Sequence, residues 1–169
     1  MKELFLVRHA KSDWGSEFIK DIDRPLNARG YDDAYLMSKW FMKNKKMPEV
    51  ILSSTATRAI NTALIFARTF EFKMDNFFIN EKIYESSVPN LISIIQKQNT
   101  SVNSIMIFCH NPCVTDFCNQ LNEGVFIDNV STCGIINLNF EIDSWKDIAS
   151  KKAKMGFFQF PKDFKNNSK

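Results

Sequence analysis

The chain has 169 residues, 44% of them apolar, which is enough to bury a sizeable core in one globular domain. Its formal charge of +3 comes from 22 basic and 19 acidic residues, and the excess lies largely in residues 151–154 and the C-terminal tail, too diffuse to indicate a nucleic-acid partner. No apolar run reaches the roughly 18 residues that a membrane span needs, so we expect no membrane partner.

The N-terminus leads directly into a strand-like stretch, without the basic region and apolar segment that mark a secretory signal. We therefore expect a cytoplasmic location with the cysteines reduced and packed as small hydrophobic side chains. A metal-binding or regulatory protein built on the cysteines is an alternative. It is disfavoured because no CxxC pair is present and structural zinc needs four convergent ligands. The four cysteines are Cys109, Cys113, Cys118 and Cys133.

Short apolar runs alternate with helical patterns along the chain. The first run, residues 4–7, has the continuous apolar character of a buried strand that is covered on both faces. A polar loop follows it, and Asn27 then offers an N-cap for the first long helix. The predicted elements after that loop are a helix at 28–45, a strand at 50–52, a helix at 56–69 capped by Ser54 or Thr55, a weaker strand at 77–79, a helix at 89–98, a strand at 105–108, a helix after Pro112, and strands at 135–142 and 155–160.

Strands that alternate with helices indicate an α/β domain. We predict a three-layer α/β/α sandwich with a mostly parallel central sheet. Residues 1–161 are expected to form a single domain, and the polar residues 162–169 are expected to be a frayed tail.

The chain has two histidines, and each lies just beyond the C-terminal end of a predicted buried strand. In open parallel sheets that edge is where ligands bind. Arg8 precedes His9, Asn111 follows His110, and Arg58 follows the second strand at the corresponding edge. Two imidazoles and two guanidiniums that converge on one crevice suit a phosphate group.

A histidine in this setting can act as a nucleophile. An imidazole held in one tautomer can attack phosphorus, which splits one difficult hydrolysis into two easier phosphoryl transfers. Arg8 and Arg58 disfavour a second positive charge and should keep His9 neutral at the attacking nitrogen. The same guanidiniums present planar donors to the phosphoryl oxygens. The alternative to a catalytic role is a structural one, in which His9 is a hydrogen-bonded structural histidine and Arg58 a solvated helix residue. The helix dipole disfavours that placement of Arg58, because it repels a cation near the N-terminus of a helix.

Four segments stand out in a fixed order: LFLVRHAKS at 4–12, DRPLNARG at 23–30, ILSSTATRAINT at 51–62 and IFCHNP at 107–112. In order and spacing they resemble the motifs of the histidine phosphatase, or phosphoglycerate-mutase-like, superfamily. Within it the chain is most similar to the short SixA-type branch, which Tyr84-Glu85 and the late Trp145 also resemble.

The resemblance implies a role for each matching residue. His9 would be the residue that becomes phosphorylated, Arg8 and Arg58 the phosphate ligands, and His110 a protonated second imidazole that donates to the phosphoryl oxygens. Glu85 would protonate the leaving oxygen and then activate water, and Ser12 and Asn111 would add neutral donors. An acid of the preceding loop, Asp13, Glu17, Asp21 or Asp23, is an alternative to Glu85. The family often has glycine where Cys109 and Cys113 stand, so these side chains could narrow the pocket.

The implied enzyme is a metal-independent phosphatase without a cofactor. It would hydrolyse a phosphomonoester or a protein phosphohistidine through a covalent phosphohistidine on His9. A mutase is an alternative, but the short chain lacks the insertions that enclose mutase substrates. A non-catalytic phosphate-binding module is another, but such a module would be expected to have lost His9 or an arginine. Short loops leave little material for a lid, so the expected partner is a phosphorylated substrate such as a phosphohistidine-bearing protein.

Overall fold

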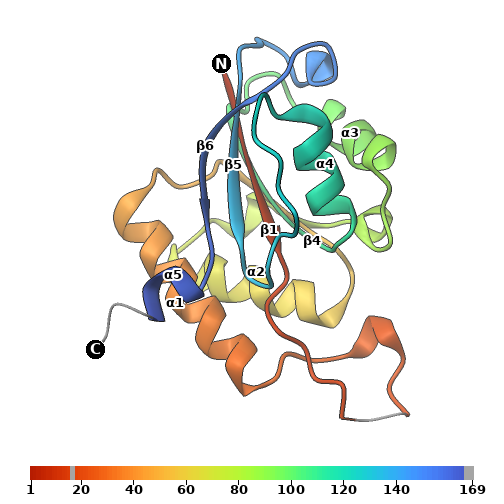
Figure 1. Ribbon diagram of the computed structural model, residues 1–169, viewed down its shortest axis with the longest axis vertical. Coiled ribbons are helices and arrows are strands. Elements are labelled where there is room, and N and C mark those ends of the chain that lie inside the picture. The colour runs from red at the N-terminus through yellow and green to blue at the C-terminus, as the bar shows by residue number, and fades with distance from the viewer. Residues whose placement is uncertain (16–17, 166–169) are drawn as a thin grey trace.

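A computed structural model of the chain describes residues 1–15 and 18–165 (Figure 1). The strands form one sheet in the order β3-β2-β4-β1-β5-β6. The first four in this order run parallel, whereas β5 is antiparallel to both of its neighbours. The sheet is therefore mostly parallel, as the sequence predicts. Its strands are β1 (Lys2–Arg8), β2 (Val50–Ser53), β3 (Phe77–Ile79), β4 (Ser104–Cys109), β5 (Ile135–Phe140) and β6 (Lys154–Gln159).

Helices cover both faces of the sheet, which confirms the three-layer arrangement (Figure 1). α1 and α2 pack on one face, and α3 and α4 pack on the other. No helix of the described residues is long and apolar enough to cross a membrane. The helices are α1 (Ala28–Asn44), α2 (Thr57–Thr69), α3 (Val88–Gln96), α4 (Cys113–Leu121) and α5 (Lys162–Lys165), with short 3-10 turns η1 (Asp21–Asp23), η2 (Met74–Asn76), η3 (Glu81–Ile83) and η4 (Trp145–Asp147).

The alternation of side chains along β1 explains why its apolar run is continuous. Leu4 and Leu6 point into the core shared with α3 and α4, whereas Phe5 and Val7 point into the core shared with α1 and α2. Because successive strand residues face opposite sides, a strand with helices on both faces needs apolar residues at every position. All four of these side chains are buried.

Several predicted boundaries differ from the structure by one or two residues, and three further differences concern a helix cap, a strand end and the tail. Ala56, not Ser54 or Thr55, is the N-cap of α2, and the hydroxyl of Ser54 instead accepts the Ala56 N–H. β5 ends at Phe140, two residues before the predicted end. The tail from residue 162 was expected to be frayed, but residues 162–165 form a helical turn because Phe164 packs on the α1 face and Lys165 pairs with the buried Asp33.

The start of α1 lies tightly against the loop that follows β1. Asn27 caps the helix by accepting the N–H of Gly30 at 2.9 Å, as predicted, and the Asn27 N–H donates to the carbonyl oxygen of Lys11 at 3.0 Å. A Cβ atom on Gly30 would lie 2.1 Å from that same oxygen. Glycine at this position therefore lets the helix approach the backbone just after His9.

Replacing Gly30 by alanine should destabilise the fold. Alanine favours a helix over glycine by about 1 kcal/mol, but the added methyl overlaps backbone that no side-chain rotation can relieve. We expect Gly30→Ala to lower the free energy of unfolding by about 1–3 kcal/mol, measured by urea denaturation. The exposed Lys39→Ala in the same helix should change it by less than about 0.5 kcal/mol. A gain in stability from Gly30→Ala would contradict the close approach.

Candidate active site

Three neighbouring strands deliver the candidate residues to one edge of the sheet. The N–H of His9 donates to the carbonyl oxygen of Cys109 at 3.0 Å, which ties the end of β1 to the end of β4. The N–H of Ser54 donates to the carbonyl oxygen of Phe108 at 3.0 Å, which ties β2 to β4 in the same way. The positions of the two histidines are therefore set by the ladder of the sheet.

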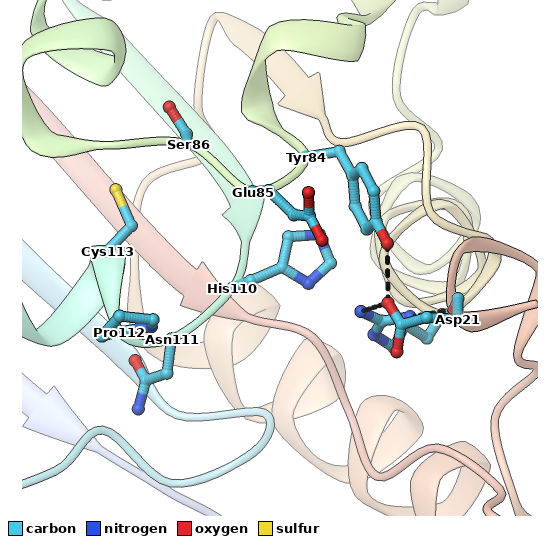
Figure 2. Close-up of a pocket in the computed structure, with 9 residues that line it drawn as sticks. Asp21, Tyr84, Glu85, Ser86, His110, Asn111, Pro112 and Cys113 are labelled. Atoms are coloured by element: carbon cyan, nitrogen blue, oxygen red, sulfur yellow. Dashed lines mark hydrogen bonds and ion pairs between the residues drawn. The ribbon is translucent and has the colours of Figure 1, made fainter.

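Two adjoining cavities open at this edge. The smaller has a volume of about 240 Å³ and is lined by Arg8, His9 and Ser12 among others. The larger, of about 460 Å³, is lined by Asp21, Glu85 and residues around them (Figure 2). The walls shared by the two cavities are Arg58, His110 and Asn111. The smaller cavity is lined by four of the five residues expected to act in catalysis: Arg8, His9, Arg58 and His110. The fifth, Glu85, lines the larger cavity.

His9 is buried and held in one orientation. Its Nδ1 lies 2.7 Å from the carbonyl oxygen of Ala10, an acceptor that requires the ring proton to be on Nδ1. Nε2 then carries the lone pair and accepts the Nε–H of Arg58 at 3.3 Å. Burial, together with the charges of His110, Arg58 and Arg8, lowers the pKa of His9 to about 3 despite the bond to Ala10. The ring is therefore neutral near pH 7, and the cause is burial more than the two arginines.

His110 lies beside His9, with 5.1 Å between the ring centroids. Its Nε2 is 2.8 Å from the hydroxyl oxygen of Ser54, and its buried Nδ1 has no hydrogen-bond partner among the described residues. Burial and then the charge of Arg58 lower the pKa of His110 to about 4. A pKa this low makes the His110 ring neutral near pH 7, so its expected protonation requires a charge that raises this pKa. An entering phosphoryl group would favour its protonation, because an anion nearby stabilises the charged form.

The two arginines are held differently. Arg8 donates from Nη1 to the carbonyl oxygen of Val130 at 2.7 Å, and its buried Nε has no partner in the described part of the chain. Arg58 is buried near the start of α2, where its carbonyl oxygen accepts the hydroxyl of Thr62. That hydroxyl oxygen accepts the N–H of Ala10 at 3.0 Å, so one threonine joins the His9 loop to the Arg58 helix. Unpaired buried polar atoms such as Arg8 Nε and His110 Nδ1 are costly. An anion would accept from Arg8 Nε, and also from His110 Nδ1 in the tautomer that carries the proton there.

Asp21 occupies the outer side of Arg58. Its Oδ2 accepts from the hydroxyl of Tyr84 at 2.8 Å (Figure 2) and from Arg58 Nη2 at 2.9 Å. Its Oδ1 accepts from Arg24 Nη2 at 2.8 Å. Its carbonyl oxygen also accepts from Arg58 Nη1 at 2.6 Å. Arg58 thus uses three of its five N–H groups within the protein, and two remain for a ligand. Sequence reasoning gave no role to Arg24 or Tyr84 here, although both lie within or beside the segments that carry the resemblance.

The structure brings two of the candidate acids to the larger cavity. Glu85 lies on its wall, exposed, beside Tyr84 (Figure 2). Its φ of 49° is in the left-handed region, which is uncommon outside glycine and gathers at functional positions. Burial acts to raise the pKa of Asp21, but hydrogen bonds from Tyr84, Arg58 and Arg24 outweigh it and hold that pKa well below its usual range. A carboxyl that stays ionised is a poor proton donor, which favours Glu85 as the acid.

Asp13 and Asp23 line neither cavity. Asp13 accepts the N–H of Gly15 in an exposed turn, and Asp23 closes η1 without lining a cavity. Glu17, the fourth acid named from the sequence, lies outside the described residues.

Neutral donors were expected from Ser12 and Asn111. The Ser12 oxygen accepts from Arg24 Nη1 at 2.8 Å, which leaves its own proton free for a ligand in the smaller cavity. Asn111 lines both cavities, but its Nδ2 donates to Asn129 and Val130 and its Oδ1 accepts from Thr115. The Nδ2 group of Asn111 already has two acceptors within the protein, so a phosphate would have to replace one of them to be bound by this amide.

The cysteines are free and buried, as predicted. Cys109 lies in the core beneath the sheet edge and lines neither cavity, so it does not narrow the pocket. Cys113 does contribute to the wall of the larger cavity. Burial raises the pKa of the Cys113 thiol to about 11, which leaves it a neutral side chain near pH 7.

Comparisons with known proteins identify relatives in sequence. Residues 4–86 match the histidine phosphatase superfamily (branch 1). An uncharacterized chloroplastic protein of Arabidopsis thaliana is 28% identical over 154 residues, which are 86% of this chain and 70% of that protein. An uncharacterized protein of Mycobacterium tuberculosis is 32% identical over 106 residues. The aligned part is 63% of this chain and 63% of that protein, less than two thirds of its length.

Solved structures share the fold over almost the whole chain. The protein histidine phosphatase SixA complexed with tungstate has a TM-score of 0.81 at 20% identity, with 95% of this chain and 98% of that chain covered. A mycobacterial glucosyl-3-phosphoglycerate phosphatase complexed with VO3 has a TM-score of 0.71 at 12% identity, with 93% and 98% covered. At these identities the likeness establishes the fold alone.

The two buried neutral histidines should make stability depend on pH. In the unfolded chain each titrates near 6.5, whereas in the fold their pKa values are about 3 and about 4. Below pH 6.5 the unfolded state therefore binds more protons than the folded state. As the pH is lowered, the free energy of unfolding decreases by up to about 1.4 kcal/mol per pH unit for each histidine. This loss continues down to the folded pKa values.

Urea denaturation between pH 7.5 and 4.5 measures this slope. His110→Gln and His9→Gln should each reduce the slope of the unfolding free energy against pH by the contribution of one histidine. The carboxylates contribute equally to wild type and both variants, so they do not affect this difference. Near pH 7.5, where the histidines are largely neutral in both the folded and the unfolded state, the three curves should run parallel. Equal slopes in wild type and variants at low pH would mean that these histidines titrate normally.

Proposed function

We propose that this chain, which belongs to the histidine phosphatase superfamily, is a phosphatase whose covalent intermediate is a phosphohistidine on His9. The superfamily that its motifs resemble is confirmed by the match over residues 4–86. The observation that carries the proposal is the state of His9, whose Nε2 lone pair is unprotonated and borders a cavity that Arg8, Arg58 and His110 also line.

In the first step, His9 Nε2 attacks the phosphorus of the bound substrate. A new N–P bond forms, the bond from phosphorus to the leaving oxygen or nitrogen breaks, and the leaving atom takes a proton from Glu85. His9 keeps its proton on Nδ1, and the carbonyl oxygen of Ala10 stabilises the positive charge that develops on the ring. The guanidiniums of Arg8 and Arg58 face the phosphoryl oxygens, where charge is spread in the transition state.

In the second step, water attacks the phosphorus and the Glu85 carboxylate takes one of its protons. The N–P bond breaks, its electron pair returns to Nε2, and inorganic phosphate leaves. Positive charge for both steps comes from arginine side chains and from His110 once an anion is bound, so the proposed reaction uses no metal ion. Turnover should accordingly survive EDTA.

The proposed substrate is a phosphorylated protein, with phosphohistidine as the favoured form. Glu85 is exposed and the Asp21 side chain is 48% exposed, so the rim of the larger cavity is open to a group carried on a protein surface. A solved relative in fold is described as a protein histidine phosphatase, and it binds tungstate. Tungstate is a tetrahedral oxyanion like phosphate, which supports oxyanion binding by this fold.

Replacing His9 by alanine should remove turnover. The other imidazole of the smaller cavity, His110, has its Nε2 engaged with the Ser54 hydroxyl at 2.8 Å, so we expect kcat to fall more than about a hundredfold. Phosphate should still bind, because Arg8, Arg58 and His110 remain, and this binding is the control for folding. Wild-type enzyme quenched during turnover of labelled substrate should carry acid-labile label on His9 by peptide mapping. Label on a serine or an aspartate would overturn the assignment.

Replacing Glu85 by glutamine should act on the leaving group. Hydrolysis of alkyl phosphates, which need a proton, should slow by roughly 10²–10⁴, whereas aryl phosphates with good leaving groups should be spared. Asp21→Asn is the matched comparison, since that carboxylate holds Arg58 and Arg24 and its loss should slow both substrate classes alike. If Glu85→Gln also slows both classes equally, Glu85 positions the phosphate and is not the acid.

A further inference from the structure

The two adjoining cavities differ in charge. Among the described residues that line the smaller cavity, four are basic and none is acidic; they are Arg8, Lys11, Arg24 and Arg58. Among those that line the larger cavity, Asp21 and Glu85 are acidic and Arg58 is the only basic one. A substrate whose phosphoryl group lies in the smaller cavity must place the group bonded to phosphorus toward the larger one.

The single cation of the larger cavity is already compensated. Arg58 pairs with the Asp21 carboxylate at 2.9 Å and with the Asp21 carbonyl oxygen at 2.6 Å. The Asp21 carboxylate also accepts from Arg24 and Tyr84, which leaves it ionised. The exposed Glu85 carboxyl has no ion-pair partner among the described residues. With Glu85 ionised, the described wall of the larger cavity carries a net negative charge. When Glu85 holds the proton that it donates in the first step, the Asp21–Arg58 pair leaves this wall neutral, and it still offers no uncompensated cation.

A second observation points to a ligand that spans both cavities. His110 is 8% exposed, lines both, and has an Nδ1 without a hydrogen-bond partner among the described residues. The other polar groups of the larger wall are a Ser86 hydroxyl that donates to its neighbour's carbonyl oxygen and an Asn111 amide that is fully engaged. The larger wall thus offers a carboxylate-bearing ligand no uncompensated cation in the described part of the chain.

We propose that the larger cavity selects substrates whose leaving group is cationic or uncharged and rejects those that carry a carboxylate. This inference rests on the proposed function, because it assigns the smaller cavity to the phosphoryl group. Phosphorylated sugar acids are then poor substrates. An imidazole leaving group fits, since the nitrogen that keeps the electron pair of the broken P–N bond takes the proton that Glu85 donates, and the imidazole departs uncharged and without a carboxylate.

Binding to the His9→Ala variant tests the selection without turnover. Three ligands of equal length differ only in their end group: phosphoethanolamine is cationic there, 2-hydroxyethyl phosphate is neutral and phosphoglycolate is anionic. By calorimetry at pH 7.5 and low salt, we expect affinity to fall in that order across about a tenfold range, as expected for two partly exposed carboxylates. At about 1 M salt, where the Debye length is roughly 3 Å, the range should shrink. Equal affinities, or phosphoglycolate binding tightest, would overturn the proposal.

A charge introduced on the rim gives a second test. Ser86→Lys adds a cation to the wall of the larger cavity and should reduce or reverse the preference against phosphoglycolate, whereas Ser101→Lys, exposed before β4 at the opposite edge, should not. An unchanged order in a folded Ser86→Lys protein counts against the proposal. If that variant fails to fold, the salt dependence decides. If turnover leaves no label on His9 but the three ligands still bind in the expected order, the proposed mechanism is wrong while the proposed charge selection holds.

Discussion

The hydrogen bond from His9 Nδ1 to the carbonyl oxygen of Ala10 is the interaction on which the rest of the site depends. It places the lone pair on Nε2 and turns that atom toward Arg58. The acceptor is itself fixed, because the Ala10 N–H donates to Thr62 and the carbonyl oxygen of His9 accepts from Cys133. A nucleophile in the wrong tautomer would be inert. The backbone of one loop therefore decides whether the chemistry is possible.

Burial and charge act together on this loop. A neutral imidazole among guanidiniums is stable only because burial and the neighbouring charges both oppose its protonation. The cost is that Arg8 and His110 keep buried nitrogen atoms without partners in the described part of the chain. A phosphoryl group supplies acceptors for the Arg8 donor and for a protonated His110 nitrogen, so the site is preorganised for an anion. Asp21 limits the accumulated charge by pairing with Arg58 and Arg24.

The parts that follow from strand patterning could be predicted from the sequence. The apolar runs before His9 and His110 fixed both strands and placed the histidines at one edge, and Asn27 marked the start of α1. Protonation states were beyond pattern reading, because the pKa of His110 depends on how much water the fold removes. The engagement of Asn111 depends on Asn129 and Val130, which reach it from a loop far along the chain. Residues 162–165 are helical and not frayed as predicted, because Lys165 pairs with the buried Asp33. The composition of the tail does not reveal this partner.

The two cavities are lined by different kinds of secondary structure, and this difference separates phosphoryl binding from recognition of the leaving group. The smaller cavity takes its histidines and Arg8 from the ends of paired strands, where the ladder permits little movement. The larger takes its acids from η1 and from the segment before α3, where Glu85 has a left-handed backbone. Loops accept substitution more readily than paired strands do. Changes at the larger cavity can therefore alter which leaving group is accepted while the phosphoryl chemistry at His9 stays the same.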